Sequence, residues 1–212
     1  MKLFSMSVRC ALLCFISSHS FAQQGAEASF ARYLGTINVL TTPAYADGQL
    51  IGCLFEFNSL SRDWTYKQGA FLQVNGSFGF YRTNNDLGVT LKVVVNEFDT
   101  VAGKFIPTSP SSAYFIDGHN TTKSSLLMKA ASDTPGGLFS VFALNPSSAI
   151  VTDGMLAGKV TIGFARKDGG VDIVLPIDVL VKDTTSSGER IRSHQMVDEF
   201  FQCLGPLIKS FE

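Results

Sequence analysis

The feature that most constrains the fold is a strict alternation of large apolar side chains with small or polar ones between positions 156 and 182. The apolar positions of this range are Leu156, Val160, Ile162, Phe164, Val171, Ile173, Leu175, Ile177, Val179 and Val181. A period of two places every second side chain on one face of a strand, and the turn residues 167–170 interrupt the pattern midway. The sequence therefore predicts a β-hairpin. Pro176 cannot donate to a ladder, so we expect its strand to lie at an edge or to carry a bulge.

The same period recurs along most of the chain. Ranges 49–57 and 89–95 predict half-buried strands, each with one apolar face. Shorter strands are predicted at 64–74, 77–82, 112–116, 122–130 and 138–143, with turns at 75–76, 84–86 and 134–137. No strands alternate with long helices, which disfavours a doubly wound sheet. We expect a mainly β protein, an antiparallel β-sandwich or barrel-like single domain.

The N-terminus predicts export. Lys2 and Arg9 precede a short apolar run at 10–16, and Ser20 and Ala22 occupy the positions that a signal peptidase reads. We interpret residues 1–22 as a secretory signal peptide and 23–212 as one β-rich domain, with a second possible cleavage frame at 26–28. The mature chain would carry 15 basic and 18 acidic side chains, a charge of −3. We expect a periplasmic or secreted protein with no integral membrane segment and no nucleic-acid partner.

Export leaves two cysteines, Cys53 and Cys203, in an oxidising compartment. A disulfide is the favoured interpretation. A catalytic thiol would need His119 or His194 as its partner, and a zinc site would need further ligands at close spacing.

The C-terminal segment changes to a helical period. Its apolar side chains recur every three or four residues: Met196, Val197, Phe200, Phe201 and Leu204. This predicts an amphipathic helix over about 193–204, ended by Gly205 and Pro206. Cys203 falls on its apolar stripe, and Cys53 shares a strand face with Ile51 and Phe55. A bridge would therefore tie the final helix to an early strand.

The sequence carries no motif for a known chemistry. It lacks a Gly-x-Ser-x-Gly nucleophile elbow, a phosphate-binding glycine loop and a pair of histidines four residues apart. His119 and Asp117 lie in a turn-like stretch and form a candidate polar site, around which a secreted hydrolase could be assembled. Asp172 and Asp178 stand roughly 20 Å apart along a strand, too far for a glycosidase pair. We expect no metal and no organic cofactor.

Aromatic residues give the remaining signal. The chain has 18 Phe but only 5 Tyr and 1 Trp, which indicates aromatics used in a core more than at a wet sugar site. Range 64–81 is unusually rich in them, and Trp64, Tyr66 and Tyr81 form a candidate contact surface, although a core hairpin explains the same pattern. We expect a non-enzymatic protein-interaction module, an inhibitor, immunity factor or envelope assembly component whose partner is another protein. The alternatives are the hydrolase around His119 and a sugar- or lipid-binding β-sandwich.

Overall fold

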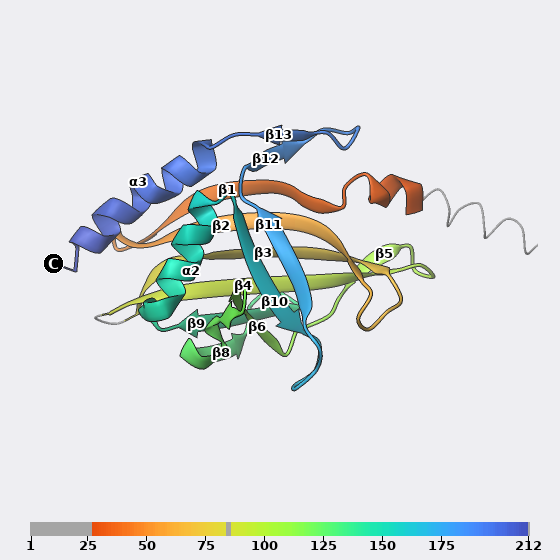
Figure 1. Cartoon of the computed structure of the whole chain (residues 1–212), viewed down its shortest axis with the longest axis horizontal. Coiled ribbons are helices and arrows are strands. Elements are labelled where there is room, and N and C mark those ends of the chain that lie inside the picture. Colours follow the sequence, from red (N-terminus) through yellow and green to blue (C-terminus); the bar gives the residue numbers. More distant parts are fainter. Residues whose placement is uncertain (1–26, 84–85, 212) are drawn as a thin grey trace, which may run out of the picture.

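A computed structural model describes residues 27–83 and 86–211, so the predicted signal peptide at 1–22 lies outside the described residues. The chain is mainly β, with antiparallel sheets and a C-terminal helix, as predicted (Figure 1). The elements are β1 (Gly35–Ala46), β2 (Gln49–Asp63), β3 (Ala70–Thr83), β4 (Asp86–Asp99), β5 (Lys104–Pro107), β6 (Ser112–Asp117), β7 (Asn120–Thr121), the 3-10 helix η1 (Thr122–Ser125), β8 (Leu126–Ala131), β9 (Gly137–Phe142), α2 (Leu144–Leu156), β10 (Lys159–Ala165), β11 (Ile173–Asp178), β12 (Val181–Thr184), β13 (Arg190–Arg192) and α3 (Gln195–Lys209).

A large sheet with the order β1-β2-β3-β4-β9-β8 forms the main layer, and β5 pairs with β4 beside it. Its register explains the alternation in the sequence. Phe55 lies opposite Phe78, which lies opposite Leu91, and all three are fully buried on the inner face. The next row, Glu56 and Ser77, faces outward. Each strand thus contributes one row to the core and one to the solvent.

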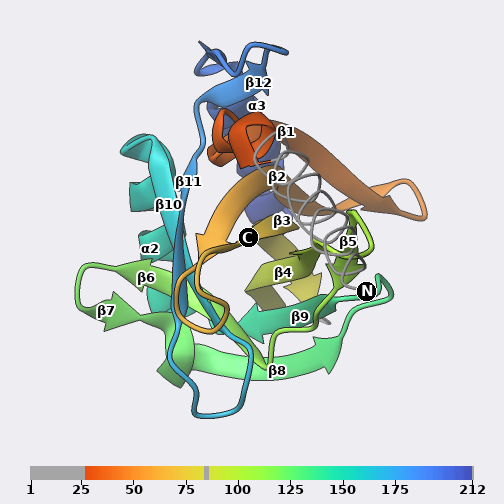
Figure 2. The ribbon, with the colours of Figure 1, turned by 90° about the vertical axis from the view of Figure 1, so that its right-hand side faces the viewer.

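A second sheet with the order β11-β10-β6-β7 crosses the inner face of the large sheet, together with α2 (Figures 1 and 2). The predicted hairpin is present as β10 and β11, and Pro176 lies on an edge strand, as expected. Its predicted start was wrong, because Leu156 ends α2 and is exposed. Helix α2 was not predicted. It buries only Ser147, Val151 and Met155, too few to produce a clear helical period.

Helix α3 packs on β1 and β2 at one end of the core. The predicted disulfide is confirmed: Cys53 of β2 is joined to Cys203 of α3, with Cα atoms 5.9 Å apart. The predicted end of this helix near 204 was wrong, because α3 runs through Pro206 to Lys209. Leu207 is fully buried, and its burial offsets the hydrogen bond that Pro206 cannot donate.

Several predicted strand limits also need correction. Asn75 and Gly76 do not form a turn but lie inside β3, where a Cβ at position 76 would stand 2.1 Å from the carbonyl oxygen of Lys92. Glycine is needed there for close strand packing. Residues 64–69 form a loop, so the predicted strand at 64–74 begins only at Ala70. The predicted strand at 122–130 likewise begins after η1, at Leu126.

The β1 edge of the large sheet is covered. The segment 179–194, which we call the strap, contains β12 and β13 and runs along β1 (Figure 1). Side chains bridge the edge and its neighbours: the Tyr33 hydroxyl donates to the Ser186 carbonyl, the Asp178 N–H to the Thr36 hydroxyl, the Arg190 guanidinium to the Leu34 carbonyl, the Thr184 hydroxyl to the Ile37 carbonyl, and the Thr41 hydroxyl to the Met196 carbonyl. This edge therefore offers little backbone for further pairing.

Within residues 27–83 and 86–211, no helix combines the length and the apolar character that crossing a bilayer requires.

Candidate functional site

The structure separates the three aromatic residues of the predicted contact surface. Trp64 and Tyr66 lie in the loop between β2 and β3, and the Tyr66 hydroxyl donates to the carbonyl of Val171. Trp64 is 71% exposed. Tyr81 lies eleven residues after Ala70 along β3, roughly 36 Å from the loop. The three side chains do not form one continuous surface.

The candidate polar site lies at the tip of a short hairpin. Asp117 pairs with Asn120 across the turn between β6 and β7, and both Asp117 and His119 are exposed. The His119 side chain makes no hydrogen bond or ion pair to the described residues. Across the same residues, no group of three His, Cys, Asp or Glu side chains is placed to hold a metal ion. Among the described residues, the structure thus gives the His119 imidazole no hydrogen-bonded acid of the kind that orients a general base.

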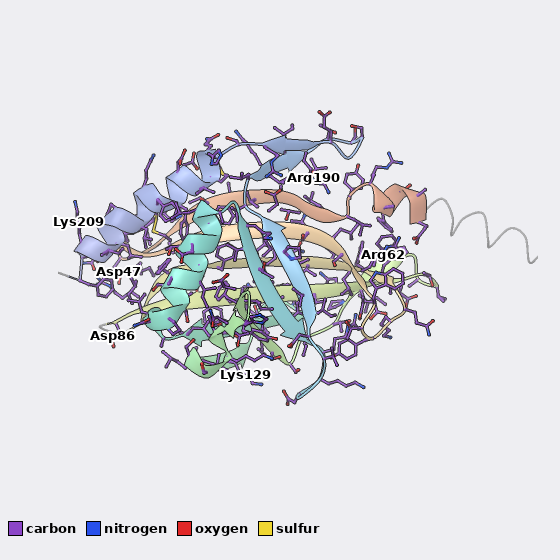
Figure 3. The ribbon with its side chains drawn as sticks, in the orientation of Figure 1. Asp47, Arg62, Asp86, Lys129, Arg190 and Lys209 are labelled. Carbon is purple, nitrogen blue, oxygen red and sulfur yellow. A yellow bond between two sulfur atoms is a disulfide. The ribbon has the colours of Figure 1, made fainter. Side chains whose placement is uncertain are left out.

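The β8 edge is the most unusual surface of the molecule. Strand β8, at the far edge of the large sheet from β1 and marked by Lys129 in Figure 3, is exposed at every one of its six positions. Leu126 is 40% exposed, Leu127 67% and Met128 49%. A strand normally buries one face, so a strand with apolar side chains and no buried face is a candidate contact surface.

The backbone of β8 is paired on one side only, with β9. The Ser132 N–H donates to the Gly137 carbonyl in the same ladder, so the register directs the backbone groups of Lys129 and Ala131 away from β9. No other described segment forms backbone hydrogen bonds with these groups. The β8 edge therefore presents free donors and acceptors beside exposed apolar side chains.

The one charge on β8 does little to protect its edge. A lysine on an edge strand often discourages pairing, because its ammonium group must stay hydrated. The Lys129 ammonium instead donates to the Ser111 carbonyl at 2.9 Å and lies 3.5 Å from the Asp168 carboxylate. Lys129 is thereby directed toward the second sheet and leaves the neighbouring Leu127 and Met128 accessible.

A small cavity of about 270 Å³ opens beside β8, between it and the second sheet. Leu126, Lys129 and Phe142 line one side, and Tyr114 lines the other. Ser140 also lines this cavity; its side chain is 1% exposed, and its hydroxyl has no hydrogen-bond partner among the described residues. A buried hydroxyl without a partner costs stability, so it marks a position where a ligand group could bind.

Charged and phenolic groups surround the mouth of this cavity. Burial raises the pKa of the Tyr114 phenol, and its hydrogen bond with Asp172 raises it further. The hydrogen bonds that Lys123 makes with Tyr114 and Asp172 raise the pKa of its ammonium group. Tyr114 therefore stays protonated and Lys123 charged at neutral pH. A neutral phenol can both donate a hydrogen bond to a bound group and accept one from it.

Sequence reasoning placed a strand here but missed its exposure. The run Leu-Leu-Met-Lys-Ala-Ala has no alternation, so it does not show which face, if either, is buried. A short apolar run without alternation also fits a fully buried strand, so the sequence alone does not distinguish the two.

Comparison of the chain with protein-family models, with curated proteins and with solved structures finds no match. No relative therefore supplies a ligand or an activity for this chain.

Proposed function

We propose that this chain is an exported, non-enzymatic protein-interaction module that binds an extended segment of another polypeptide at the β8 edge. The partner segment adds to the large sheet as a further strand. The observation that carries the proposal is the complete exposure of β8, an apolar strand whose outer edge has no backbone partner among the described residues. An inhibitor, an immunity factor and an envelope assembly component are the roles that fit such a module.

An extended polypeptide is the occupant because its backbone complements that of β8. Lys129 and Ala131 offer outward N–H and C=O groups at the spacing of a strand, and a partner strand supplies acceptors and donors at the same spacing. The exposed Leu127 and Met128 would add apolar contact, since burying such side chains is favourable.

Selectivity would come from the cavity beside β8. Side chains of an added strand alternate between its two faces, so those on one face would approach the cavity that Leu126 and Lys129 line. The free Ser140 hydroxyl favours a partner side chain that can hydrogen-bond there. The hydrolase alternative lacks comparable support, because no acidic side chain of residues 27–83 or 86–211 pairs with His119.

Export is part of the proposal. The Cys53–Cys203 disulfide is typical of proteins outside the cytoplasm, which supports the interpretation of residues 1–22 as a signal peptide. The intact mass of protein recovered from periplasm or medium tests this point. A mature chain beginning near Gln23 is the expected result, and a recovered mass that includes Met1–Ala22 would contradict it.

A photo-crosslinking amino acid placed at Leu127 tests the binding site, with Ile191 on β13 as the matched control. Ile191 is also an exposed apolar residue on a short strand, but it lies in the strap. We expect a discrete cross-linked protein from position 127 and none from position 191. Ala131→Pro, which removes an outward N–H, should abolish the cross-link while the melting temperature stays near that of the wild type.

Equal cross-linking from both positions would contradict the proposal, as would a cross-link that survives Ala131→Pro. A cross-linked dimer of this chain would mean that the partner at the β8 edge is a second copy of the chain and not a different protein.

A further inference from the structure

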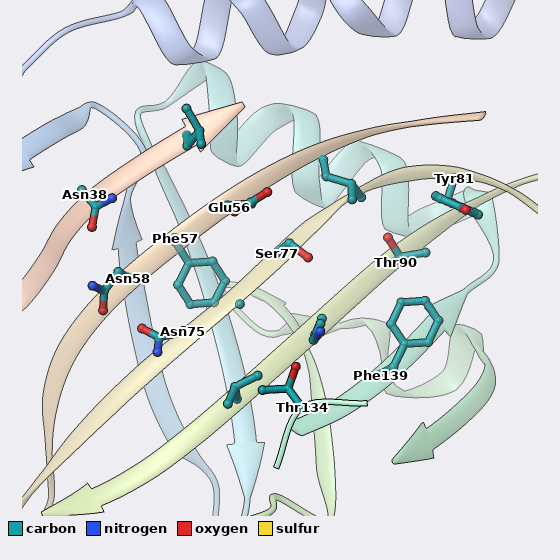
Figure 4. Close-up of a pocket in the computed structure, with 15 residues that line it drawn as sticks. Asn38, Glu56, Phe57, Asn58, Asn75, Ser77, Tyr81, Thr90, Thr134 and Phe139 are labelled. Atoms are coloured by element: carbon teal, nitrogen blue, oxygen red, sulfur yellow. The ribbon is translucent and has the colours of Figure 1, made fainter. Parts of the chain in front are cut away.

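The outer face of the large sheet contains a groove that the β8 edge does not use. It has a volume of about 850 Å³ and extends over β1, β2, β3, β4 and β9, with one wall completed by the loop before β9 (Figure 4). Neither α2, α3 nor the second sheet covers this face, because all of them pack against the opposite side (Figures 1 and 2). The size of the groove is within the range of ligand-binding sites.

One end of the groove is a row of amides. Asn38 lies opposite Asn58 in the pairing of β1 with β2, and Asn58 lies opposite Asn75 in the pairing of β2 with β3. All three side chains line the groove. The amide oxygens of Asn58 and Asn75 are buried and receive no hydrogen bond from the described residues. Two buried acceptors side by side are costly unless a ligand or water supplies donors.

The charged side chains in the middle of the groove are the Glu56 carboxylate and a lysine paired with an acid. Glu56 accepts a hydrogen bond of 2.8 Å from the Thr42 hydroxyl, and the Lys92 ammonium lies 2.9 Å from the Asp133 carboxylate. The hydrogen bond from Lys92, aided by one from Ser132, lowers the pKa of Asp133 to about 2. Lys92 therefore stays neutralised across the physiological pH range. Of the described residues that line the groove, Lys92 alone is cationic, and it is paired, so none is free to hold a polyanion.

The other end of the groove is aromatic. Tyr81 lies there, on the far side of Ser77 and Thr90 from the asparagines, whereas Phe139 lies opposite Lys92 in the pairing of β4 with β9, level with Ser77 (Figure 4). The Tyr81 ring lies against Gly52, where a Cβ would stand 2.6 Å from a ring carbon. Glycine thus provides the space that keeps this ring flat on the sheet. From Asn75 to Tyr81 the groove follows β3 for six residues, roughly 20 Å.

We infer that this groove binds an uncharged oligosaccharide. Sugar hydroxyls donate and accept, so one ligand can hydrogen-bond with Ser77 and Thr90 and, when the Asn58 and Asn75 side chains rotate toward the groove, with their amide oxygens. The apolar face of a sugar ring can pack on an aromatic ring such as Tyr81 or Phe139. Because the two ends lie roughly 20 Å apart, a single sugar ring does not contact both.

Other ligand classes fit less well. An apolar ligand would leave the buried amide oxygens without donors. A nucleic acid or an acidic glycan would meet the Glu56 carboxylate and only a paired lysine. An extended peptide pairs through its backbone, but every strand under the groove is already paired on both sides with its neighbours or lies against the strap.

The test is calorimetric titration of the full mature protein with neutral hexasaccharides of glucose, of N-acetylglucosamine and of mannose. We expect at least one of them to bind. Asn58→Ala and Asn75→Ala should each weaken that binding by roughly tenfold, the cost of one hydrogen bond to a buried group. Gln73→Ala is the matched control, because Gln73 lies on the same strand β3 but does not line the groove.

Unfolding curves of the variants separate loss of binding from loss of fold, and NMR shifts of the asparagine side-chain amides report binding directly. Three results would overturn the inference: no hexasaccharide binding below about 1 mM, equal weakening by Gln73→Ala, or tighter binding of an acidic hexasaccharide. Ala131→Pro at the β8 edge should leave sugar binding unchanged, so this site and the polypeptide site can fail separately.

Discussion

The two edges of the large sheet are treated in opposite ways. At β1, the Thr184 hydroxyl of the strap donates to the Ile37 carbonyl of the edge, and the Thr41 hydroxyl of the edge donates to the Met196 carbonyl of α3. At β8, every residue is exposed and no described segment pairs with the outer side. A covered edge has few free backbone groups with which to pair another strand, whereas an open apolar edge has free N–H and C=O groups that can pair with one. The β1 edge is therefore secured by the rest of the fold, and the open β8 edge is the one at which we propose that a partner binds.

The covered edge depends on a covalent link. The strap leads directly into α3, and α3 is bonded to β2 through Cys203 and Cys53. The open edge has no such support and sits at the end of the sheet farthest from the disulfide. One sheet thus combines a fixed edge with an accessible one.

Loss of the disulfide should have the largest effect. Cys203→Ser is expected to lower the free energy of unfolding by about 2–5 kcal/mol, because the bridge closes a loop of 150 residues and restricts the unfolded chain. Chemical denaturation measures the change, and limited proteolysis should cut near α3 first. Earlier cleavage at β8 than at α3 would mean that the disulfide does not secure the covered edge. In the wild-type mature protein, unfolded without reduction, titration with a thiol reagent should find no free thiol, because both cysteines are in the disulfide.

Loss of one edge hydrogen bond should have a smaller effect. Thr36 is buried, and its hydroxyl accepts a hydrogen bond of 2.8 Å from the Asp178 N–H. Thr36→Val removes this acceptor and should cost about 1–3 kcal/mol, because the N–H of Asp178 then has no partner. The control is Thr100→Val in an exposed turn, which should change little. Equal melting temperatures for the two variants would show that the β1 edge is not secured by such bonds.

Substitution on the open edge should have the smallest effect on stability. Leu127 is 67% exposed, so Leu127→Lys should shift the free energy of unfolding by less than about 0.5 kcal/mol. The same change should strongly reduce partner binding at the β8 edge. A loss of several kcal/mol would show that Leu127 supports the fold and would remove the contrast between the edges.

The parts of the fold that sequence predicted are those with a strong local pattern. The hairpin of β10 and β11 alternates clearly, and the apolar stripe of α3 places Cys203 toward the core. Helix α2 was not predicted because it buries few side chains and so shows no clear helical period. Asn75-Gly76 was wrongly predicted to be a turn, because Gly76 is needed for close strand packing and not for a turn. The row of asparagines in the groove was not predicted, because Asn38, Asn58 and Asn75 are brought together only by the strand register, which the sequence does not show. The exposure of β8 was also not predictable, because it depends on where the other elements of the fold pack, and none of the described ones covers this strand.

Amide hydrogen exchange tests the central claim most directly, using the partner recovered through the cross-link at Leu127. In the free protein, the amides of Lys129 and Ala131 should exchange quickly, and those of the covered part of β1 slowly. Adding the partner should slow exchange at residues 126–131 and leave β1 unchanged, because a new strand protects the outward N–H groups. Unchanged exchange at 126–131 in the saturated complex, with protection elsewhere, would contradict the account.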